Sequence, residues 1–242
     1  MRYIYLLFIA LFCCVGTSQA QRVPAWGGGA DLTDFSFGFS FSYVTSYLKI
    51  DKQLNWQQPF PDVETGGNLT PGLRGISLPN APGFAVGLLA RYTLTSHLEA
   101  RTTPSIVFAD RKLIYYYLDN TTTEKQVNNT MIDLPVLLKL KSDRLGDLRG
   151  YLIGGVKLSG AVGRKNDDAE KGLLDKMVKN KRMYASYEVG VGCDIYFEFF
   201  KMSPEVKLSN SIGNILVREN HPYSTPLSGL GLHTIQFSLY FE

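Results

Sequence analysis

Cysteine is scarce in this sequence of 242 residues, and long apolar runs are missing. Two of the three cysteines, Cys13 and Cys14, lie close to the N-terminus, so the rest of the chain keeps only Cys193. A single cysteine cannot form an internal disulfide bond. After the N-terminal segment, no apolar stretch approaches the roughly 18–20 residues that a transmembrane helix needs. The sequence therefore excludes a disulfide-stapled domain and a helical membrane protein.

Strong charge and reactive motifs are also missing. The formal net charge of +3 is too small to indicate a nucleic-acid partner. The sequence contains no CxxC, HExxH, phosphate-loop or calcium-loop pattern, so we expect no metal, no cofactor and no small-molecule substrate. A hydrolytic centre could be built from His221 with Ser224 or Glu219, but no spacing supports it. We predict no catalytic residues and a protein that is not an enzyme.

The N-terminal segment has the features of a signal peptide. Met1-Arg2 supplies a positive charge, the apolar run Tyr3–Val15 follows, and Ser18-Gln19-Ala20 fits a small-x-small cleavage site. The run is too short to span a membrane as a helix. We therefore predict a signal peptide over residues 1–20, a flexible glycine-rich lead-in over 21–33, and a single domain over 34–242.

The stretch from Asp34 to Tyr43 is the most regular in the chain. Its odd positions from 35 onward are all aromatic, and only Ser or Gly separates them. Successive side chains of a strand point to opposite faces, so one face is all ring and the other nearly bare. An aromatic face turned outward with small residues turned inward is what a narrow membrane barrel requires.

The same alternation recurs seven more times. The predicted strands cover about 34–50, 83–94, 98–108, 131–141, 150–162, 183–197, 202–209 and 229–241. Pro104 lacks a ladder donor and should mark a break in the third strand, which could run on to Leu118 before a polar tip at 119–129. The proline-rich segment 51–82 is predicted to be an extended loop.

The connections between these strands alternate between long and short. Long loops at one end and short turns at the other are the plan of an outer-membrane barrel. We therefore predict an all-β fold, an eight-stranded antiparallel transmembrane up-and-down β-barrel in the outer membrane of a Gram-negative bacterium. Both termini should be periplasmic, and the long loops should be extracellular.

The predicted inward face carries charges of both signs that nearly cancel. They are Arg91, Arg101, Lys139, Lys141, Lys157 and Lys207 against Glu99, Asp133, Glu188, Asp194 and Glu205. Buried charges must be paired, and an eight-stranded barrel has room only for its own side chains. We expect a salt-bridged plug; a lumen that conducts protons or solutes is the alternative.

The long segment 163–182 is the candidate partner-binding surface. Its acidic residues come first and its basic residues last, which suits a short helix and its dipole. Its apolar stripe could dock a partner, and its basic end could meet lipid headgroups. The alternative is a solvated, mobile loop. The candidate residues are Leu173, Leu174, Met177, Lys179, Lys181 and Arg182.

Two runs in the chain suggest a family. The run Pro82–Gly87 leading to Arg91-Tyr92, together with Ile132–Lys141, resembles PorT-type outer-membrane barrels of the type IX secretion pathway, and the resemblance extends over essentially the whole mature chain. It implies a membrane component needed for export and maturation of secreted proteins such as proteases, with other secretion subunits and outer-membrane lipid as partners. It implies no catalytic residues. One departure is that Glu242 follows Phe241, whereas barrels commonly finish on an aromatic residue.

Two other functions fit a barrel of this size. The first is an outer-membrane barrel enzyme acting on lipid or peptide, for which His221 and His233 would be the residues to substitute. The second is an OmpX-like structural barrel that binds lipopolysaccharide or an external ligand through its loops. Neither is favoured by a motif of its own.

Overall fold

The computed structural model describes residues 33–62, 66–127, 130–162 and 172–242. The predicted signal peptide and all but the last residue of the predicted lead-in lie outside the described residues. Throughout the described ranges, every regular element is a strand. No helix in the described part of the chain is long and apolar enough to cross a membrane.

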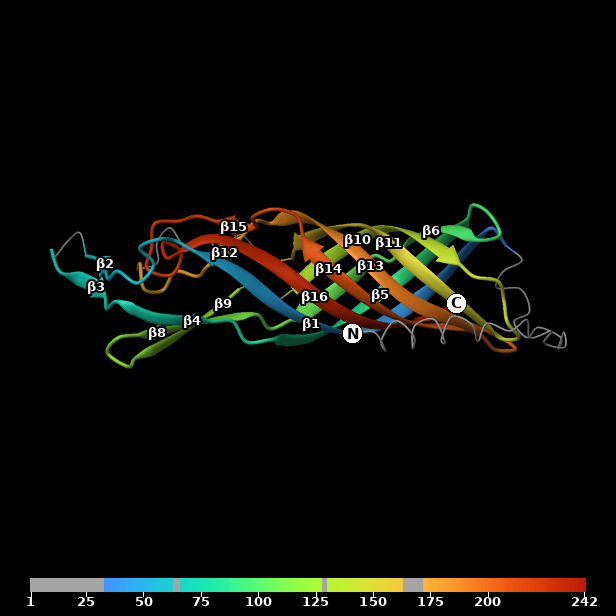
Figure 1. The fold of residues 1–242 in the computed structure, drawn as a ribbon, viewed down its shortest axis with the longest axis horizontal. Coiled ribbons are helices and arrows are strands. Elements are labelled where there is room, and N and C mark those ends of the chain that lie inside the picture. Colours follow the sequence, from blue (N-terminus) through green and yellow to red (C-terminus); the bar gives the residue numbers. More distant parts are fainter. Residues whose placement is uncertain (1–32, 63–65, 128–129, 163–171) are drawn as a thin grey trace, which may run out of the picture.

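The main sheet closes on itself into a barrel (Figure 1). Its strands are β1 (Phe35–Lys52), β5 (Ala81–Thr93), β6 (Leu98–Thr102), β7 (Ser105–Ala109), β10 (Thr130–Lys141), β11 (Leu148–Ala161), β13 (Met183–Tyr196), β14 (Lys201–Ser211) and β16 (Leu227–Phe241). All pair antiparallel, and β1 pairs with both β16 and β5, which closes the ring. Both β6 and β7 pair with β5 on one side and β10 on the other, so together they occupy the place of a single barrel strand. The ring therefore has eight positions, as predicted.

The interruption between β6 and β7 falls at Thr103 and Pro104. There the carbonyl oxygen of Pro104 accepts a hydrogen bond from the Leu88 amide at 2.9 Å, while Pro104 itself has no amide hydrogen to give to the ladder. The predicted break at Pro104 is confirmed. The other strand ends differ from the predicted ones by a few residues.

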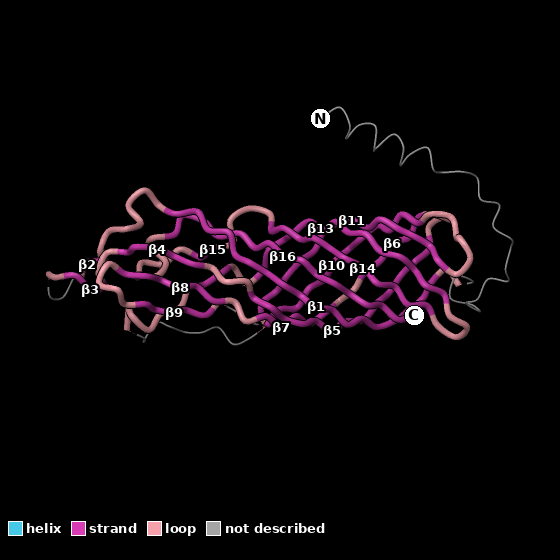
Figure 2. The backbone as a smooth tube through the Cα atoms, turned by 60° about the horizontal axis from the view of Figure 1, so that its bottom comes forward, coloured by secondary structure: helices cyan, strands magenta, loops and turns pink. Residues whose placement is uncertain are grey.

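Short turns join β5 to β6, β10 to β11 and β13 to β14, and the long segments leave from the opposite end (Figure 2). Asp34 and Glu242 lie at the short-turn end, where the Asp34 carbonyl accepts a hydrogen bond from the Thr93 amide at 2.7 Å and Glu242 exchanges backbone hydrogen bonds with Lys201. The predicted alternation of connection lengths is confirmed.

The long segments are more structured than the sequence suggested. They contain β2 (Phe60–Pro61), β3 (Asn68–Thr70), β4 (Leu73–Ser77), β8 (Lys112–Tyr117), β9 (Thr122–Gln126), β12 (Lys179–Asn180) and β15 (Leu216–Val217). Strands β4, β8 and β9 form a separate three-stranded sheet, and the pairs β2–β3 and β12–β15 form two small ribbons. We call this region, beyond the long-loop end of the barrel, the head.

Two predictions for the long segments were therefore wrong in detail. The proline-rich segment 51–82 is not one extended loop, because β4 pairs with β8 between its prolines. The third barrel strand does not continue unbroken to Leu118, since β7 ends at Ala109 and β8 joins the head sheet instead. The polar tip at 119–129 includes strand β9. These pairings join segments far apart in sequence, which local patterning cannot show.

The aromatic row lies on the outer surface of β1, as predicted. Phe35, Phe37, Phe39, Phe41 and Tyr43 are all exposed on the isolated chain, Phe37 to 69 %. The Phe39 ring stacks on Phe241 of β16, with ring centres 5.2 Å apart. Ser40 and Ser42 are buried on the opposite face. Outward apolar residues on the other barrel strands complete a hydrophobic wall suited to lipid.

Candidate functional site

The barrel interior is filled by ion pairs. A first cluster lies near the short turns and contains Arg91, Glu99, Lys139, Lys141, Asp194, Lys201 and Glu242, all with buried side chains. Glu99 is at its centre: it pairs with Arg91 at 3.2 Å, lies 3.8 Å from the ammonium group of Lys139, and accepts a hydrogen bond from Lys141. Lys139 also pairs with Asp194 at 2.7 Å.

A second cluster continues the pattern farther along the lumen. It contains Arg101, Asp133, Lys157, Glu188, Glu205 and Lys207. Arg101 pairs with Glu205 at 2.7 Å. Lys157 lies 3.0 Å from both Asp133 and Glu188. The eleven inward charges predicted from strand alternation are thus all buried and paired, and the predicted salt-bridged interior is confirmed.

Tyr151 joins the two clusters. Its hydroxyl donates a hydrogen bond of 2.8 Å to Glu205, and its ring lies 3.8 Å from the ammonium group of Lys139. The ring fits because the facing residue is Gly192, where a Cβ atom would come within 2.5 Å of the Tyr151 ring. An eight-stranded barrel is only just wide enough for its own side chains. In this barrel the space is filled by the two ion-pair clusters and by Tyr151 between them.

Sequence reasoning missed two members of the first cluster. Lys201 lies four residues before Glu205 on β14 and therefore shares its inward face, but the predicted strand began one residue too late. Glu242 turns inward after Phe241 and pairs with Arg91 and, at 2.8 Å, with Lys201. Glu242, which stands where barrels commonly have an aromatic residue, thus has a structural role: its side-chain carboxylate neutralises two buried cations.

The head has its own apolar core, placed over the long-loop mouth of the barrel. The core residues are Leu48, Leu73, Leu113, Tyr115, Tyr117, Val127, Met131, Val178, Tyr184, Ile215, Leu216, Tyr223, Leu227, Leu230 and Leu232. They come from barrel strands as well as from the long segments. The Tyr115 hydroxyl donates a hydrogen bond of 2.7 Å to the Tyr223 carbonyl, which ties β8 to the loop 218–226. The head is therefore packed against the barrel and continuous with it.

The candidate partner-binding residues lie in and around strand β12 of this head. No helix forms over 172–182; a turn around residues 173–175 and strand β12 replace it, and residues 163–171 lie outside the described part. Strand β12 pairs with β15, and Val178 enters the head core. These tertiary contacts outweigh the local charge pattern that favoured a helix. Leu173, Leu174, Lys181 and Arg182 are exposed, whereas Met177 and Lys179 are half-buried.

His221 and Ser224 are both buried in the turn 219–225, but each is engaged with backbone. The His221 Nδ1 atom accepts a hydrogen bond from the Tyr223 amide at 3.3 Å, and the Ser224 hydroxyl accepts one from the Glu219 amide at 3.1 Å. His221 Nε2 lies 3.7 Å from Glu219. His233 is elsewhere on the barrel wall, where its ring lies tilted against that of Tyr47 and is hydrogen-bonded to Asn210. The structure does not bring His221 and His233 into one site.

The burial of His221 predicts an acid-sensitive head. Burial lowers the pKa of His221 from 6.5 to about 4, reinforced by Lys176, Lys179 and Lys125 and opposed by Glu219. In the unfolded chain the histidine takes up its proton near pH 6.5, whereas in the folded protein His221 takes up its proton only near pH 4. The stabilisation is therefore complete above pH 6.5 and is lost progressively as the pH falls towards 4.

We expect the melting temperature of the head, followed by tryptophan fluorescence, to fall on acidification through this range. His221→Asn keeps an acceptor for the Tyr223 amide without titrating, so it should flatten the dependence. Gln57→Asn, at an exposed head residue that does not titrate, serves as the control and should leave the profile unchanged. An equally steep profile in His221→Asn would contradict the assignment.

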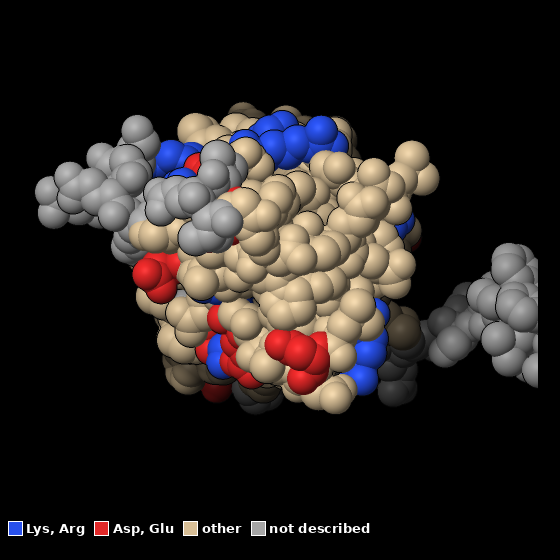
Figure 3. Space-filling view, turned by 90° about the vertical axis from the view of Figure 1, so that its left-hand side faces the viewer, with Lys and Arg blue, Asp and Glu red and all other residues tan. Residues whose placement is uncertain are grey.

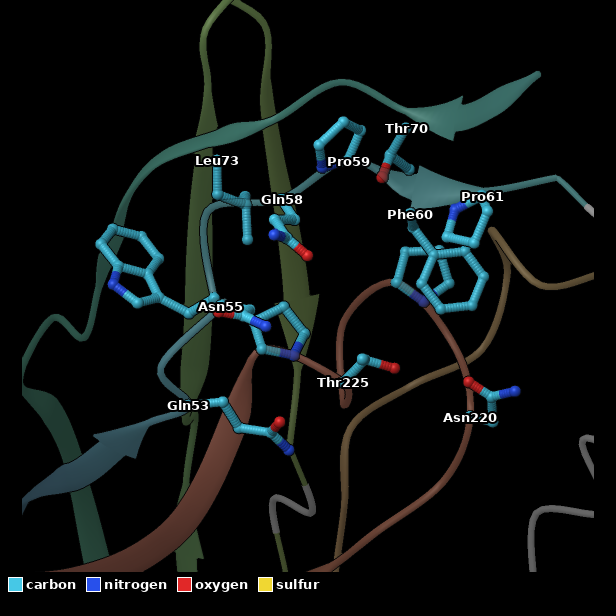
Figure 4. Close-up of a pocket in the computed structure, with 13 residues that line it drawn as sticks. Gln53, Asn55, Gln58, Pro59, Phe60, Pro61, Thr70, Leu73, Asn220 and Thr225 are labelled. Atoms are coloured by element: carbon cyan, nitrogen blue, oxygen red, sulfur yellow. The ribbon is translucent and has the colours of Figure 1, made fainter.

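A pocket of about 370 Å³ opens in the head between two of the long segments (Figure 4). We call it the loop pocket; it is lined by Gln53, Asn55, Trp56, Gln58, Pro59, Phe60, Pro61, Thr70, Leu73, Asn220, Pro222, Thr225 and Pro226. One wall comes from residues 53–61 with Thr70 and Leu73, and the other from residues 220–226. In the view onto the long-loop end, much of the surface belongs to uncharged residues, with basic side chains along the upper rim and both acidic and basic side chains lower down (Figure 3).

A comparison with known protein families agrees with this architecture. Residues 33–217 match a family model described as an outer membrane protein beta-barrel domain. A search of curated proteins finds no significant match. Among solved structures, the chain is similar to the outer membrane protein OprG from Pseudomonas aeruginosa, with 12 % identity, a TM-score of 0.46, and 90 % of this chain and 95 % of that chain covered.

Two further structures are similar to this chain. Neisserial surface protein A shares 9 % identity with a TM-score of 0.43, covering 86 % of this chain and 98 % of its own. The attachment invasion locus protein Ail of Yersinia pestis shares 12 % identity with a TM-score of 0.35, covering 85 % of this chain and 96 % of its own.

Proposed function

Because this chain belongs to the outer membrane protein beta-barrel domain family and is an outer-membrane β-barrel, we propose that it is a non-enzymatic accessory of the type IX secretion machinery. Its role would be to support export and maturation of secreted proteins such as proteases. The runs Pro82–Gly87 and Ile132–Lys141, which resemble PorT-type barrels, supply the specific link. The proposed orientation places both termini in the periplasm and the head outside the cell.

The observation that carries this proposal is the filled interior. The ion-pair clusters occupy the lumen, and the apolar head core lies over its long-loop mouth. Opening a conduit would separate paired charges inside a low-dielectric wall, which is energetically costly. A barrel closed in this way acts through its surfaces. Other secretion subunits and outer-membrane lipid are the partners that such surfaces would meet.

Deletion of the gene tests the proposal. Cargo proteases should accumulate unprocessed in the periplasm, and the wild-type gene supplied in trans should restore their secretion. Immunoblots of periplasmic and extracellular fractions measure both outcomes. Normal secretion in the deletion strain would contradict the proposal, and loss of envelope integrity with intact secretion would favour the structural barrel instead.

The candidate partner surface is tested in the same strain. The double variant Leu173→Glu with Leu174→Glu places charges on two exposed apolar residues of the head, and we expect it to lose copurifying secretion subunits. Leu54→Glu is the matched control, because Leu54 is a fully exposed leucine elsewhere in the head. If the two variants copurify equal amounts of secretion subunits, this surface is not the docking site.

A further inference from the structure

The loop pocket has a lining without charge. None of its thirteen lining residues is acidic, basic or a histidine. Four carry carboxamide groups, namely Gln53, Asn55, Gln58 and Asn220, and most of the remainder are prolines or aromatic residues. A charged ligand would find no counter-charge there, and a wholly apolar ligand would leave the amide groups without partners. The lining thus favours a neutral ligand that is polar at its edges.

Three of these carboxamides are available to a ligand. Among the described residues, the side chains of Asn55, Gln58 and Asn220 form no hydrogen bond with other protein groups, and all three are exposed. A carboxamide both donates and accepts hydrogen bonds, and a sugar hydroxyl does the same. Phe60 and Pro61 supply flat apolar surface in the same pocket (Figure 4), and Pro222 also lines it. This surface matches the C–H face of a sugar ring.

The walls of the loop pocket are held in place before any ligand arrives. The backbone amide of Gln53 donates a hydrogen bond of 3.0 Å to the backbone carbonyl of Pro226, which joins the two walls. The Leu73 amide donates one of 3.0 Å to the Gln57 carbonyl, and Phe60 of β2 pairs with Thr70 of β3. Preformed walls reduce the ordering cost of binding. The volume of about 370 Å³ lies within the usual range for small-ligand sites.

We propose that the loop pocket is a binding site for a short neutral oligosaccharide. Gln58, Asn55 and Asn220 hydrogen-bond the sugar hydroxyls, and Phe60 packs on the ring face. This ligand is additional to the secretion role proposed above, and its binding to the purified barrel does not depend on that role. The sugar could belong to lipopolysaccharide of the same membrane or to a free glycan, and the two sources share this chemistry.

Trp56 provides a local reporter. The sequence has two tryptophans, so Trp26→Phe leaves Trp56, which lines the pocket, as the single one. The full mature barrel is placed in lipid nanodiscs, since maltoside detergents would compete for the site. The probes are maltopentaose, mannopentaose, and delipidated polysaccharide from the lipopolysaccharide of the host strain. We expect a saturable change in Trp56 fluorescence with at least one of them; preference for the host polysaccharide identifies the membrane source.

Three variants in the same Trp26→Phe background locate the binding. Phe60→Ala should weaken binding by about tenfold or more, and Gln58→Ala by about fivefold, because each removes one part of the recognition. Gln57→Ala is the matched control: Gln57 is exposed and adjacent but does not line the pocket, so affinity should not change. Heat-modifiable migration on gels verifies that each variant is folded.

Several results would overturn the proposal. They are the absence of a saturable response to all three sugars, unchanged affinity in both Phe60→Ala and Gln58→Ala, and stronger binding of heparin than of the neutral sugars. Tighter binding of a polyproline peptide would also overturn it, because proline-rich segments dock on aromatic-lined grooves. In that case the pocket would be a peptide site.

Discussion

Glu99→Gln is expected to destabilise the barrel by about 3–5 kcal/mol, the usual cost of leaving buried ions without a partner. Glu99 is fully buried and serves three cations at once, Arg91, Lys139 and Lys141. Arg91 keeps Glu242 as a partner and Lys139 keeps Asp194, but Lys141 loses its ion pair with Glu99. Urea unfolding of the barrel in lipid vesicles measures the difference.

Two further variants show whether charge is the cause. Glu198→Gln makes the same chemical change on an exposed short turn, and its stability should stay within about 0.5 kcal/mol of the wild type. Adding Lys141→Met to Glu99→Gln removes the stranded cation and should recover part of the lost stability. If Glu99→Gln unfolds at the wild-type urea concentration, the first ion-pair cluster does not stabilise the barrel.

Val136→Arg is expected to cost about 2–4 kcal/mol, because it places a charge in the middle of the lipid-facing wall. Val136 is the third of five consecutive outward apolar residues on β10 and is 63 % exposed on the isolated chain. Its hydrogen-bonded neighbours on β6 and β11 leave the side chain no inward alternative. Unfolding in vesicles and the yield of heat-modifiable barrel after refolding both report the effect.

Leu54→Arg is the control for this variant. Leu54 is fully exposed in the head, so the arginine there meets water, and stability should change by less than about 0.5 kcal/mol. Equal stability of the two variants would mean that the wall around Val136 does not face lipid. A large loss in Leu54→Arg would instead place part of the head in the membrane.

Much of the barrel could be predicted because its information is local. A strand alternates with a period of two, so each predicted segment also assigned its own inward and outward residues. The aromatic row on β1 and the eleven inward charges were found in this way, without knowledge of any partner strand. Lys201 was missed because the predicted strand began one residue after it, and strand boundaries are the least certain feature of such reasoning.

The head and the loop pocket could not be predicted in this way. Strand β4 lies between prolines and pairs with β8 about forty residues later, a contact that neither segment signals by itself. The residues 172–182 carry a charge order that suits a helix, yet pairing with β15 and the burial of Val178 impose another conformation. The walls of the loop pocket come from segments 53–61 and 220–226, which only folding brings together.

The aromatic row from Phe35 to Tyr43 shows which features the sequence determines and which the tertiary structure decides. By itself the sequence determined that these rings face one way and the small residues the other, since alternation is a property of the single strand. Only the tertiary structure decided which of the inward charges pair: Glu205 with Arg101, Glu99 with Lys141, and Glu242 with Arg91. The reason is that a charge pair depends on distance across the lumen, which strand register and barrel closure set.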